Sequence, residues 1–238
     1  MSNTNFVNSN AATEDFEFSA LEKAVNYRQS LMREFEPFLK GQVLEVGSGI
    51  GQMTQLLLTK KSVENVHCVE PEQLLFERLK AKGFMARLTC GTILNVPEVN
   101  YYDVVFSVNV LEHIEEDRQE LKCYADKLRE GGRLCLLVPA CPSIYSPIDK
   151  SFGHYRRYTK KNLTKIVCAA GLQIEHIHYY NSVGYVAWWL SFCVLKQMSF
   201  KASSVFFYDR LIFPMVHALE YYVLRPPLGQ SLLVIAKK

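Results

Sequence analysis

The chain has 238 residues, of which 49% are hydrophobic and 21% charged, and its formal net charge is +3. These values are typical of a globular protein and argue against a disordered chain. A charge so close to zero also lacks the strongly basic surface of most nucleic-acid-binding proteins, so no nucleic acid is expected as a partner. The seven cysteines are scattered, without the spacing of a zinc site or a disulfide framework. We therefore expect a cytoplasmic protein without a metal site.

The N-terminus carries no signal-peptide pattern, and residues 1–18 are expected to be disordered. Residues 19–238 are expected to fold as a single domain. Ser19 and Glu22 form a potential capping box, and apolar residues at helical spacing then predict an opening helix that closes at Pro37. Tyr27 lies in this helix, either packed in the core or facing the loop that follows.

Residues 43–53 read VLEVGSGIGQM, an apolar strand-like run that enters a turn with three alternating glycines and continues as a helix. Such a turn lets a ligand approach the backbone, and the helix start offers unpaired N–H groups. A dinucleotide-binding turn needs its third glycine one position later, which disfavours a nicotinamide oxidoreductase. A tight strand–helix connection without a ligand is the alternative.

The next elements alternate between strands and helices. Residues 63–70 predict a strand that ends at Glu70, where a carboxylate could accept hydrogen bonds from both ribose hydroxyls or simply be solvated. A helix over residues 72–82 ends at Gly83, and a strand over 84–90 leads to the loop of Gly91, Thr92 and Ile93, which could lie along an adenine ring.

Residues 102–108 form a dense apolar run, typical of a strand buried on both faces, and it ends at residues 109–113. The following helix is expected to extend to residue 129 and to end at Gly131 and Gly132, before a strand over 133–140. This alternation predicts a parallel sheet with ligands beyond the carboxyl ends of its strands. Five separate stretches are expected at that edge: residues 47–51, residue 70, and residues 91–93, 109–113 and 139–141.

Four stretches of the sequence together resemble class I S-adenosylmethionine-dependent methyltransferases of the small bacterial type. They are EVGSGIG at 45–51, EP at 70–71, YDVVFSVNVLEH at 102–113 and LREGGRL at 128–134. The resemblance covers about residues 27–140. It implies an α/β, Rossmann-like, doubly wound sheet of seven strands with the last one antiparallel, and S-adenosylmethionine as the cofactor.

The resemblance also implies roles for individual residues. The methionine part of the cofactor would be held by Glu45, Gly47, Ser48, Gly49 and Gly51, with Tyr27 at its carboxylate. Glu70, followed by Pro71, would bind the ribose, Gly91, Thr92 and Ile93 would flank adenine, and Asn109, Val110 and His113 would line the floor near the sulfonium. His113 could instead be satisfied within its own helix start. Many relatives have an acidic residue after the third strand, and its absence here implies backbone and apolar contacts to adenine.

Residues 145–158 are dense in Tyr, His and Arg beyond what a helix or strand requires. His154 could act as a general base, because the ordinary pKa of histidine is about 6.5. Tyr158 is predicted to be a second catalytic residue. Arg156 and Arg157 could hold an anionic group of an acceptor, and Tyr145, Asp149 and Trp188 are assigned to the acceptor as well. The alternative is an ion-paired network that fixes the loop. A Gly-His-x-Arg-Arg-Tyr stretch resembles one subgroup of the methyltransferases.

A helix capped by Thr159 and ended by Gly171 precedes strands over 172–180 and 231–236. The segment between them, residues 181–230, is expected to be an aromatic-rich helical insertion. It could pack on the sheet edge, cover an apolar acceptor as a lid, or make a peripheral membrane contact through residues 183–222. Its uncharged run over 183–195 is too short to span a bilayer.

The sequence therefore predicts methyl transfer from S-adenosylmethionine to an O or N nucleophile of a small-molecule or lipid-like acceptor. The alternative is a non-catalytic binding protein that keeps the fold and uses the aromatic insertion to hold a partner. The acceptor and the oligomeric state are left open.

Overall fold

The computed structural model describes residues 23–197, 202–222 and 226–238. The expected disorder of residues 1–18 and the capping box at Ser19 and Glu22 lie outside the described residues. Side chains of residues 202, 221 and 222 are likewise not described.

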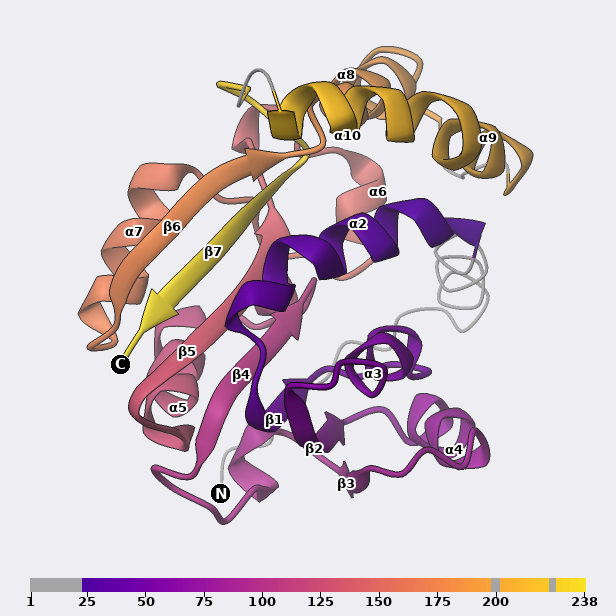
Figure 1. Ribbon diagram of the computed structural model, residues 1–238. Coiled ribbons are helices and arrows are strands. Elements are labelled where there is room, and N and C mark those ends of the chain that lie inside the picture. Colours follow the sequence, from indigo (N-terminus) through magenta and orange to yellow (C-terminus); the bar gives the residue numbers. More distant parts are fainter. Residues whose placement is uncertain (1–22, 198–201, 223–225) are drawn as a thin grey trace.

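A seven-stranded sheet with the order β3-β2-β1-β4-β5-β7-β6 forms the centre of the molecule (Figure 1). Its strands are β1 (Gly41–Val46), β2 (Val63–Glu70), β3 (Arg87–Cys90), β4 (Tyr102–Val108), β5 (Leu128–Pro139), β6 (Gln173–Tyr180) and β7 (Ser231–Lys237). Only β7 runs antiparallel to its two neighbours, β5 and β6. The prediction of an α/β, Rossmann-like, doubly wound sheet with an antiparallel last strand is confirmed.

Helices cover both faces of the sheet. One face packs against α2 (Val25–Phe35), α3 (Gln52–Leu57) and α4 (Gln73–Ala81), through buried residues such as Leu31, Leu57 and Leu79. The other packs against α5 (Asp117–Lys127) and α7 (Lys160–Ala169), which contribute Leu121 and Leu163. Strand β4 is buried on both faces, as its composition predicts, with Val105 in one hydrophobic cluster and Val104 and Phe106 in the other.

The predicted boundary between the fifth strand and the helix before it is wrong. The helix ends at Lys127, and β5 starts at Leu128, which is buried and pairs with Tyr102. Gly131 and Gly132 therefore lie inside the strand, where the register against β4 shifts and Gly131 adopts a φ of 76°. A pair of glycines after a helical pattern fits a helix end and a strand irregularity equally well, and pairing with Tyr102 decides for the second.

The carboxyl edge of the sheet is covered by the segment between β6 and β7 (Figure 1). It contains α8 (Ser182–Trp188), a π-helical turn (Trp189–Val194), α9 (Ala202–Phe207), a second π-helical turn (Tyr208–Ile212) and α10 (Phe213–Tyr222). Pro214 is the second residue of α10, close to the end of the second π-helical turn. Of the described helices, none has both the length and the hydropathy needed to cross a membrane.

The second π-helical turn is tied to the opening helix by Asp209. Its carboxylate accepts hydrogen bonds from the backbone N–H groups of Asn26 and Tyr27, at 2.9 and 2.8 Å. These are first-turn donors of α2, whose own preceding residue, Ala24, has no side chain that could cap them. Residues almost two hundred positions apart along the chain thus form one helix terminus.

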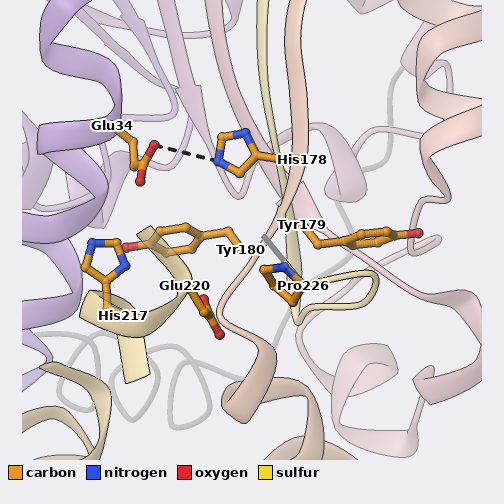
Figure 2. A pocket seen from close by; sticks show the side chains of 7 residues that line it. All are labelled: Glu34, His178, Tyr179, Tyr180, His217, Glu220 and Pro226. Carbon is orange, nitrogen blue, oxygen red and sulfur yellow. Dashed lines mark ion pairs between the residues drawn. The ribbon is translucent and has the colours of Figure 1, made fainter. Parts of the chain in front are cut away.

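A small pocket lies between α2, β6 and α10, near the end of β6 (Figure 2). Glu34 and His178 form an ion pair on one side of it, with 3.7 Å between Oε2 and Nε2, and Tyr180 and His217 lie on another. Its volume of about 20 Å³ is close to that of one water-sized sphere. It is too small for a metabolite.

Candidate functional site

The glycine-rich turn follows β1 at the carboxyl edge of the sheet. Gly47, Gly49 and Gly51 have φ angles of 72°, 53° and 83°, which L residues with a side chain rarely adopt. A Cβ on Gly47 would come within 2.3 Å of Val110, and one on Gly51 within 2.5 Å of Phe84. Glycine is therefore required both by the backbone and by the close approach of neighbouring side chains.

Glu70 joins the tip of β2 to this turn. One carboxylate oxygen accepts a hydrogen bond from the N–H of Gly49 at 2.7 Å, and the other accepts from the N–H of Glu72 at 3.0 Å. Burial raises the pKa of Glu70, and the two N–H donors partly oppose that rise. Each oxygen keeps a second lone pair, so the carboxylate can still accept further hydrogen bonds from a ligand. Pro71 follows at the surface and ends the strand.

Glu45 lies below the turn and faces α3. Its carboxylate accepts hydrogen bonds from the Thr54 hydroxyl at 2.5 Å and from the Cys68 thiol at 3.5 Å. Burial raises its pKa to about 7, although Thr54 and Cys68 lower it in part. The predicted direct contact with the methionine part of a cofactor does not match this placement, because the side chain is buried and directed at α3. Ser48 is buried too, with its hydroxyl donating to the Glu45 carbonyl.

The loop after β3 differs in part from its predicted role. Thr92 caps a 3-10 turn (Ile93–Asn95), and Gly91 approaches the Asn95 side chain so closely that a Cβ would lie 2.4 Å from Oδ1. Ile93 is fully buried in the core, at 0% exposure, so its side chain cannot flank an adenine ring. Leu94 is the exposed apolar side chain of this loop, and sequence reasoning did not single it out.

Residues 109–113 follow β4 and sit beside the glycine-rich turn, because Val110 fills the space left by Gly47. Asn109 has a positive φ of 54°, which asparagine tolerates better than most residues. A 3-10 turn (Leu111–His113) then brings Glu112 and His113 to the same edge. Glu112 is fully buried, and the ring of His113 remains accessible.

Tyr27 reaches this edge from α2. Its ring packs against Tyr180 and Phe213, with centroids 5.5 and 5.4 Å away. Burial raises its pKa to about 12, while a hydrogen bond with Ser231 lowers it and the charge of Glu112 adds to the rise. Tyr27 was expected either to pack in the core or to face the glycine-rich loop. Its ring packs in the core, whereas its hydroxyl lies among polar groups.

His154 meets His113 across the edge. The two rings are nearly perpendicular, at 85°, with centroids 4.7 Å apart. The backbone N–H of Tyr155 donates to the Glu112 carbonyl at 2.8 Å, which fixes the loop of His154 against the turn after β4. Burial and the neighbouring His154 lower the pKa of His113. A hydrogen bond with the Phe152 backbone opposes this only in part.

Asp149 organises the loop around His154. It is fully buried, and its carboxylate accepts hydrogen bonds from Ser146, from Arg157 Nε at 2.8 Å and from His154 Nδ1 at 3.1 Å. Burial would raise the pKa of Asp149, but the hydrogen bond from His154 and the charge of Arg157 outweigh it and lower the pKa. This is the loop-fixing network that was the alternative to acceptor binding.

Arg157 and Trp188 belong to the same network. Arg157 is only 4% exposed, donates to the Ala140 carbonyl and lies over the Trp188 ring, with 4.4 Å from Cζ to the centroid. Trp188 donates from its indole N–H to the Ile144 carbonyl at 3.2 Å. The assignment of Asp149, Arg157 and Trp188 to direct acceptor contact therefore conflicts with their burial.

Tyr158 is buried as well, at 0% exposure, with its hydroxyl donating to the Asp117 carboxylate at 3.0 Å. A direct part in catalysis does not fit that position. Arg156 is more open and pairs with Asp117 at 2.8 Å, and Tyr145 is exposed, with its hydroxyl donating to the His154 carbonyl. Among the residues assigned to the acceptor, these two remain at the surface.

Sequence reasoning gave no role to Glu112, although it lies at the centre of the edge. It reads as part of a helix start in the sequence, and its neighbours His154 and Tyr27 come from distant segments. Its burial within the turn after β4 is what distinguishes it from the acidic residues that follow.

The chain matches the family model described as a methyltransferase domain over residues 22–182. No curated protein sequence matches it. Three solved structures have the same fold at low identity. A SAM-dependent methyltransferase from Thermotoga maritima is 16% identical, with a TM-score of 0.63, over 94% of this chain and 97% of that one. One from Archaeoglobus fulgidus is 16% identical, with a TM-score of 0.60, over 94% and 97%. One from Mesorhizobium loti is 13% identical, with a TM-score of 0.61, over 87% and 95%.

The matched segment contains the glycine-rich turn, Glu70 and the edge around Glu112. It ends just after β6, so the insertion and β7 lie beyond it. Since the family model covers more than half of the sequence, the chain belongs to the methyltransferase domain family.

Proposed function

We propose that the chain is a cytoplasmic enzyme that transfers a methyl group from S-adenosylmethionine to an O or N nucleophile of a small-molecule or lipid-like acceptor. The hydrogen bond between Glu70 and the Gly49 N–H carries this proposal, because it places an acidic strand tip against a glycine-rich turn in a methyltransferase domain. Residues 19–238 would act as one domain.

The residues at the edge fit the cofactor in polarity and in shape. The backbone of residues 47–51 would border its methionine part, since the positive φ angles of its three glycines shape a turn that a ligand can approach closely. Glu70 would accept hydrogen bonds from the ribose hydroxyls with its remaining lone pairs. Gly91, Thr92 and the exposed Leu94 would border adenine, and Asn109, Val110 and His113 would border the sulfonium. Tyr27 would bind the carboxylate.

S-adenosylmethionine supplies a methyl group on a sulfonium sulfur, which the acceptor nucleophile attacks in line. The chain's contribution would be positioning, since the donor-side and acceptor-side residues lie at the same edge of the sheet. His154 would take the acceptor's proton at Nε2. Asp149 supports this role, because its hydrogen bond to Nδ1 leaves the lone pair on Nε2.

The insertion supports a lipid-like acceptor. Its two helical parts carry exposed apolar side chains, and we propose that these share one surface, which we call the aromatic face: Val186, Trp189, Leu190, Val194, Leu195, Phe206, Phe207, Leu211, Ile212, Met215 and Leu219. Aromatic and aliphatic side chains gathered on surface helices are typical of peripheral membrane contact. We propose that this face rests on a membrane surface, which would bring a lipid-like acceptor to the carboxyl edge beneath it.

Calorimetry with S-adenosylhomocysteine tests the cofactor assignment. We expect the folded wild type to bind, and Gly49→Ala to lose most of its affinity because strain at a φ of 53° would shift the turn and its hydrogen bond to Glu70. Gly83→Ala is the matched control, since Gly83 also has a positive φ, 63°, but no neighbouring atom lies within 4 Å of the position that its Cβ would take, and it lies away from the edge. Wild-type protein that gives no heat at high micromolar ligand would refute the proposal.

Glu70→Gln gives a second test. Loss of a charged acceptor for two hydroxyls should weaken binding by roughly 10- to 100-fold, because hydrogen bonds to charged groups contribute about 1.5 to 3 kcal/mol. Glu77→Gln, on the exposed side of α4, should bind like the wild type. Equal affinities for all three proteins would remove Glu70 from the site.

A further inference from the structure

Three side chains with metal-binding atoms meet at the acceptor side of the edge. The carboxylate of Glu112 and the rings of His113 and His154 each offer one atom, and these atoms lie within 4.8 Å of one another. Glu112 Oε1 is 4.0 Å from His154 Nε2. Two of the residues come from the turn after β4 and the third from the loop after α6 (Pro147–Ser151), so the fold, not the local sequence, brings them together.

The His154 ring is held in an orientation that suits a metal ligand. Nδ1 is bonded to Asp149 at 3.1 Å, and Asp149 is itself held by Arg157 and by Ser146. A carboxylate accepts only, so Nδ1 carries the hydrogen and the lone pair lies on Nε2, toward Glu112. A buried carboxylate that orients a histidine in this way is the usual companion of a metal-binding imidazole.

The His113 ring is oriented by a second acceptor. One of its ring nitrogens is hydrogen-bonded to the backbone of Phe152, which leaves the other for a ligand. Gly153 follows Phe152 with a φ of 77°, and a Cβ there would lie 3.7 Å from His113 Nδ1. Each of the two histidines thus has one nitrogen bound to its surroundings and one available in the shared space.

We propose that Glu112, His113 and His154 bind a divalent transition-metal ion of the Zn²⁺ class. Two imidazole nitrogens and one carboxylate oxygen are the donors that such ions prefer, whereas Mg²⁺ and Ca²⁺ prefer oxygen alone. Ligand atoms about 2.1 Å from one ion lie roughly 3 to 3.5 Å apart, so small side-chain rotations would close the present spacing. Three protein ligands leave an open position on the ion.

The role of the ion, though not its binding, rests on the proposed function. An acceptor hydroxyl bound at the open position would lose its proton to solvent more readily, because the cation stabilises the resulting oxyanion. The oxygen–carbon bond would then form as the carbon–sulfur bond of the donor breaks. Ion binding uses the lone pair of His154 Nε2, so in the loaded protein the ion takes the place of the imidazole as the group that activates the acceptor.

The test titrates chelator-treated protein with Zn²⁺ by calorimetry and with Co²⁺ by visible absorption. We expect one ion per chain and the absorption bands of nitrogen and oxygen ligands. His113→Asn and Glu112→Gln should each weaken binding by more than the roughly 10- to 100-fold typical for loss of an orienting carboxylate. His113→Asn is the safer variant, because this side chain is accessible and Glu112 is buried. The control is His176→Asn, which removes an exposed histidine on β6.

Several results would overturn the inference. They are no Co²⁺ binding by the wild type at high micromolar concentration, affinities of both variants equal to that of the wild type, or the strong near-ultraviolet bands of thiolate ligands. S-adenosylhomocysteine calorimetry on the same preparations separates the two proposals. Cofactor binding without ion binding refutes only the metal site, and ion binding without cofactor binding refutes only the proposed function.

Discussion

Glu45 shows how burial makes a single carboxyl group sensitive to neutral pH. In the unfolded chain its pKa would be 4.5, and in the folded protein burial raises it to about 7. Folding therefore favours the protonated form. The stability that this gives is complete below about pH 4.5 and is lost as the pH rises through about 7, where the buried group must ionise.

We expect Glu45→Gln to reduce the fall in stability between mildly acidic and alkaline pH. Between about pH 5.5 and about pH 8.5 the free energy of unfolding of the wild type should drop by about 2 kcal/mol more than that of the variant, since one pKa unit corresponds to about 1.4 kcal/mol. Urea denaturation at the two pH values measures this. Burial also raises the pKa of Glu120, but that contribution is common to both proteins. Parallel pH profiles would contradict the assignment.

The neighbours Arg156 and Arg157 are equivalent in sequence but not in the fold. Arg157 pairs with a fully buried carboxylate and packs on Trp188, whereas Arg156 pairs with Asp117 near the surface, with 30% of its side chain exposed. Removing one partner of a buried pair leaves an uncompensated charge, while surface pairs contribute little.

Arg157→Ala should therefore lower the free energy of unfolding by about 3 kcal/mol or more. Arg156→Ala should lower it by about 1 kcal/mol or less. Thermal or urea denaturation of the two variants side by side is the measurement. Similar losses would mean that Asp149 is not compensated by Arg157 as the geometry indicates.

At the scale of elements, the opening helix depends on a residue of the insertion. Asp209 occupies the position of an N-cap for α2 although it belongs to the segment between β6 and β7. The π-helical turn that carries it also precedes Pro214, which lacks an N–H and so suits a place where regular helical bonding is interrupted.

Asp209→Ala should destabilise the protein by about 2 kcal/mol, the upper range for a lost cap, because two enclosed N–H groups lose their acceptor. Asp209→Asn keeps one acceptor oxygen and should lose less. Urea denaturation gives both values, and hydrogen exchange at Asn26 and Tyr27 reports the cap directly. Unchanged exchange in Asp209→Ala would show that α2 is capped in another way.

At the scale of the whole molecule, the aromatic face predicts an affinity for membranes. The wild type should sediment with vesicles of phosphatidylcholine and phosphatidylglycerol. The double variant Trp189→Ser with Phe207→Ser should bind at least about tenfold more weakly, since these side chains are 47% and 57% exposed and would both be buried in the interface. Met85→Ser, which removes an even more exposed apolar residue before β3, is the control. Wild type that stays in solution would refute the contact.

The sequence was sufficient for the sheet, because its strands are short apolar runs punctuated by turns, and for the carboxyl edge, because parallel strands gather their ends there. It was insufficient where partners come from distant segments. The sequence around Arg157 does not predict its contacts with Asp149 and Trp188, and Glu112 lies near His154 only in the folded chain. The assignment of Ile93 to the adenine site was wrong for another reason. An apolar side chain beside a predicted site is equally suited to the core, and Ile93 is buried.

The position of β7 has a consequence for how the chain is made. This strand lies between β5 and β6, yet it is the last of the seven to leave the ribosome. Until residues 231–237 are available, β5 has one unpaired edge and β6 has no partner in the sheet, and an emerging chain with such exposed edges is open to mispairing with its neighbours. Completion of the sheet, and with it burial of the hydrophobic residues on both of its faces, must therefore wait for residues 231–237, and chaperones that hold unfinished chains would act during that interval.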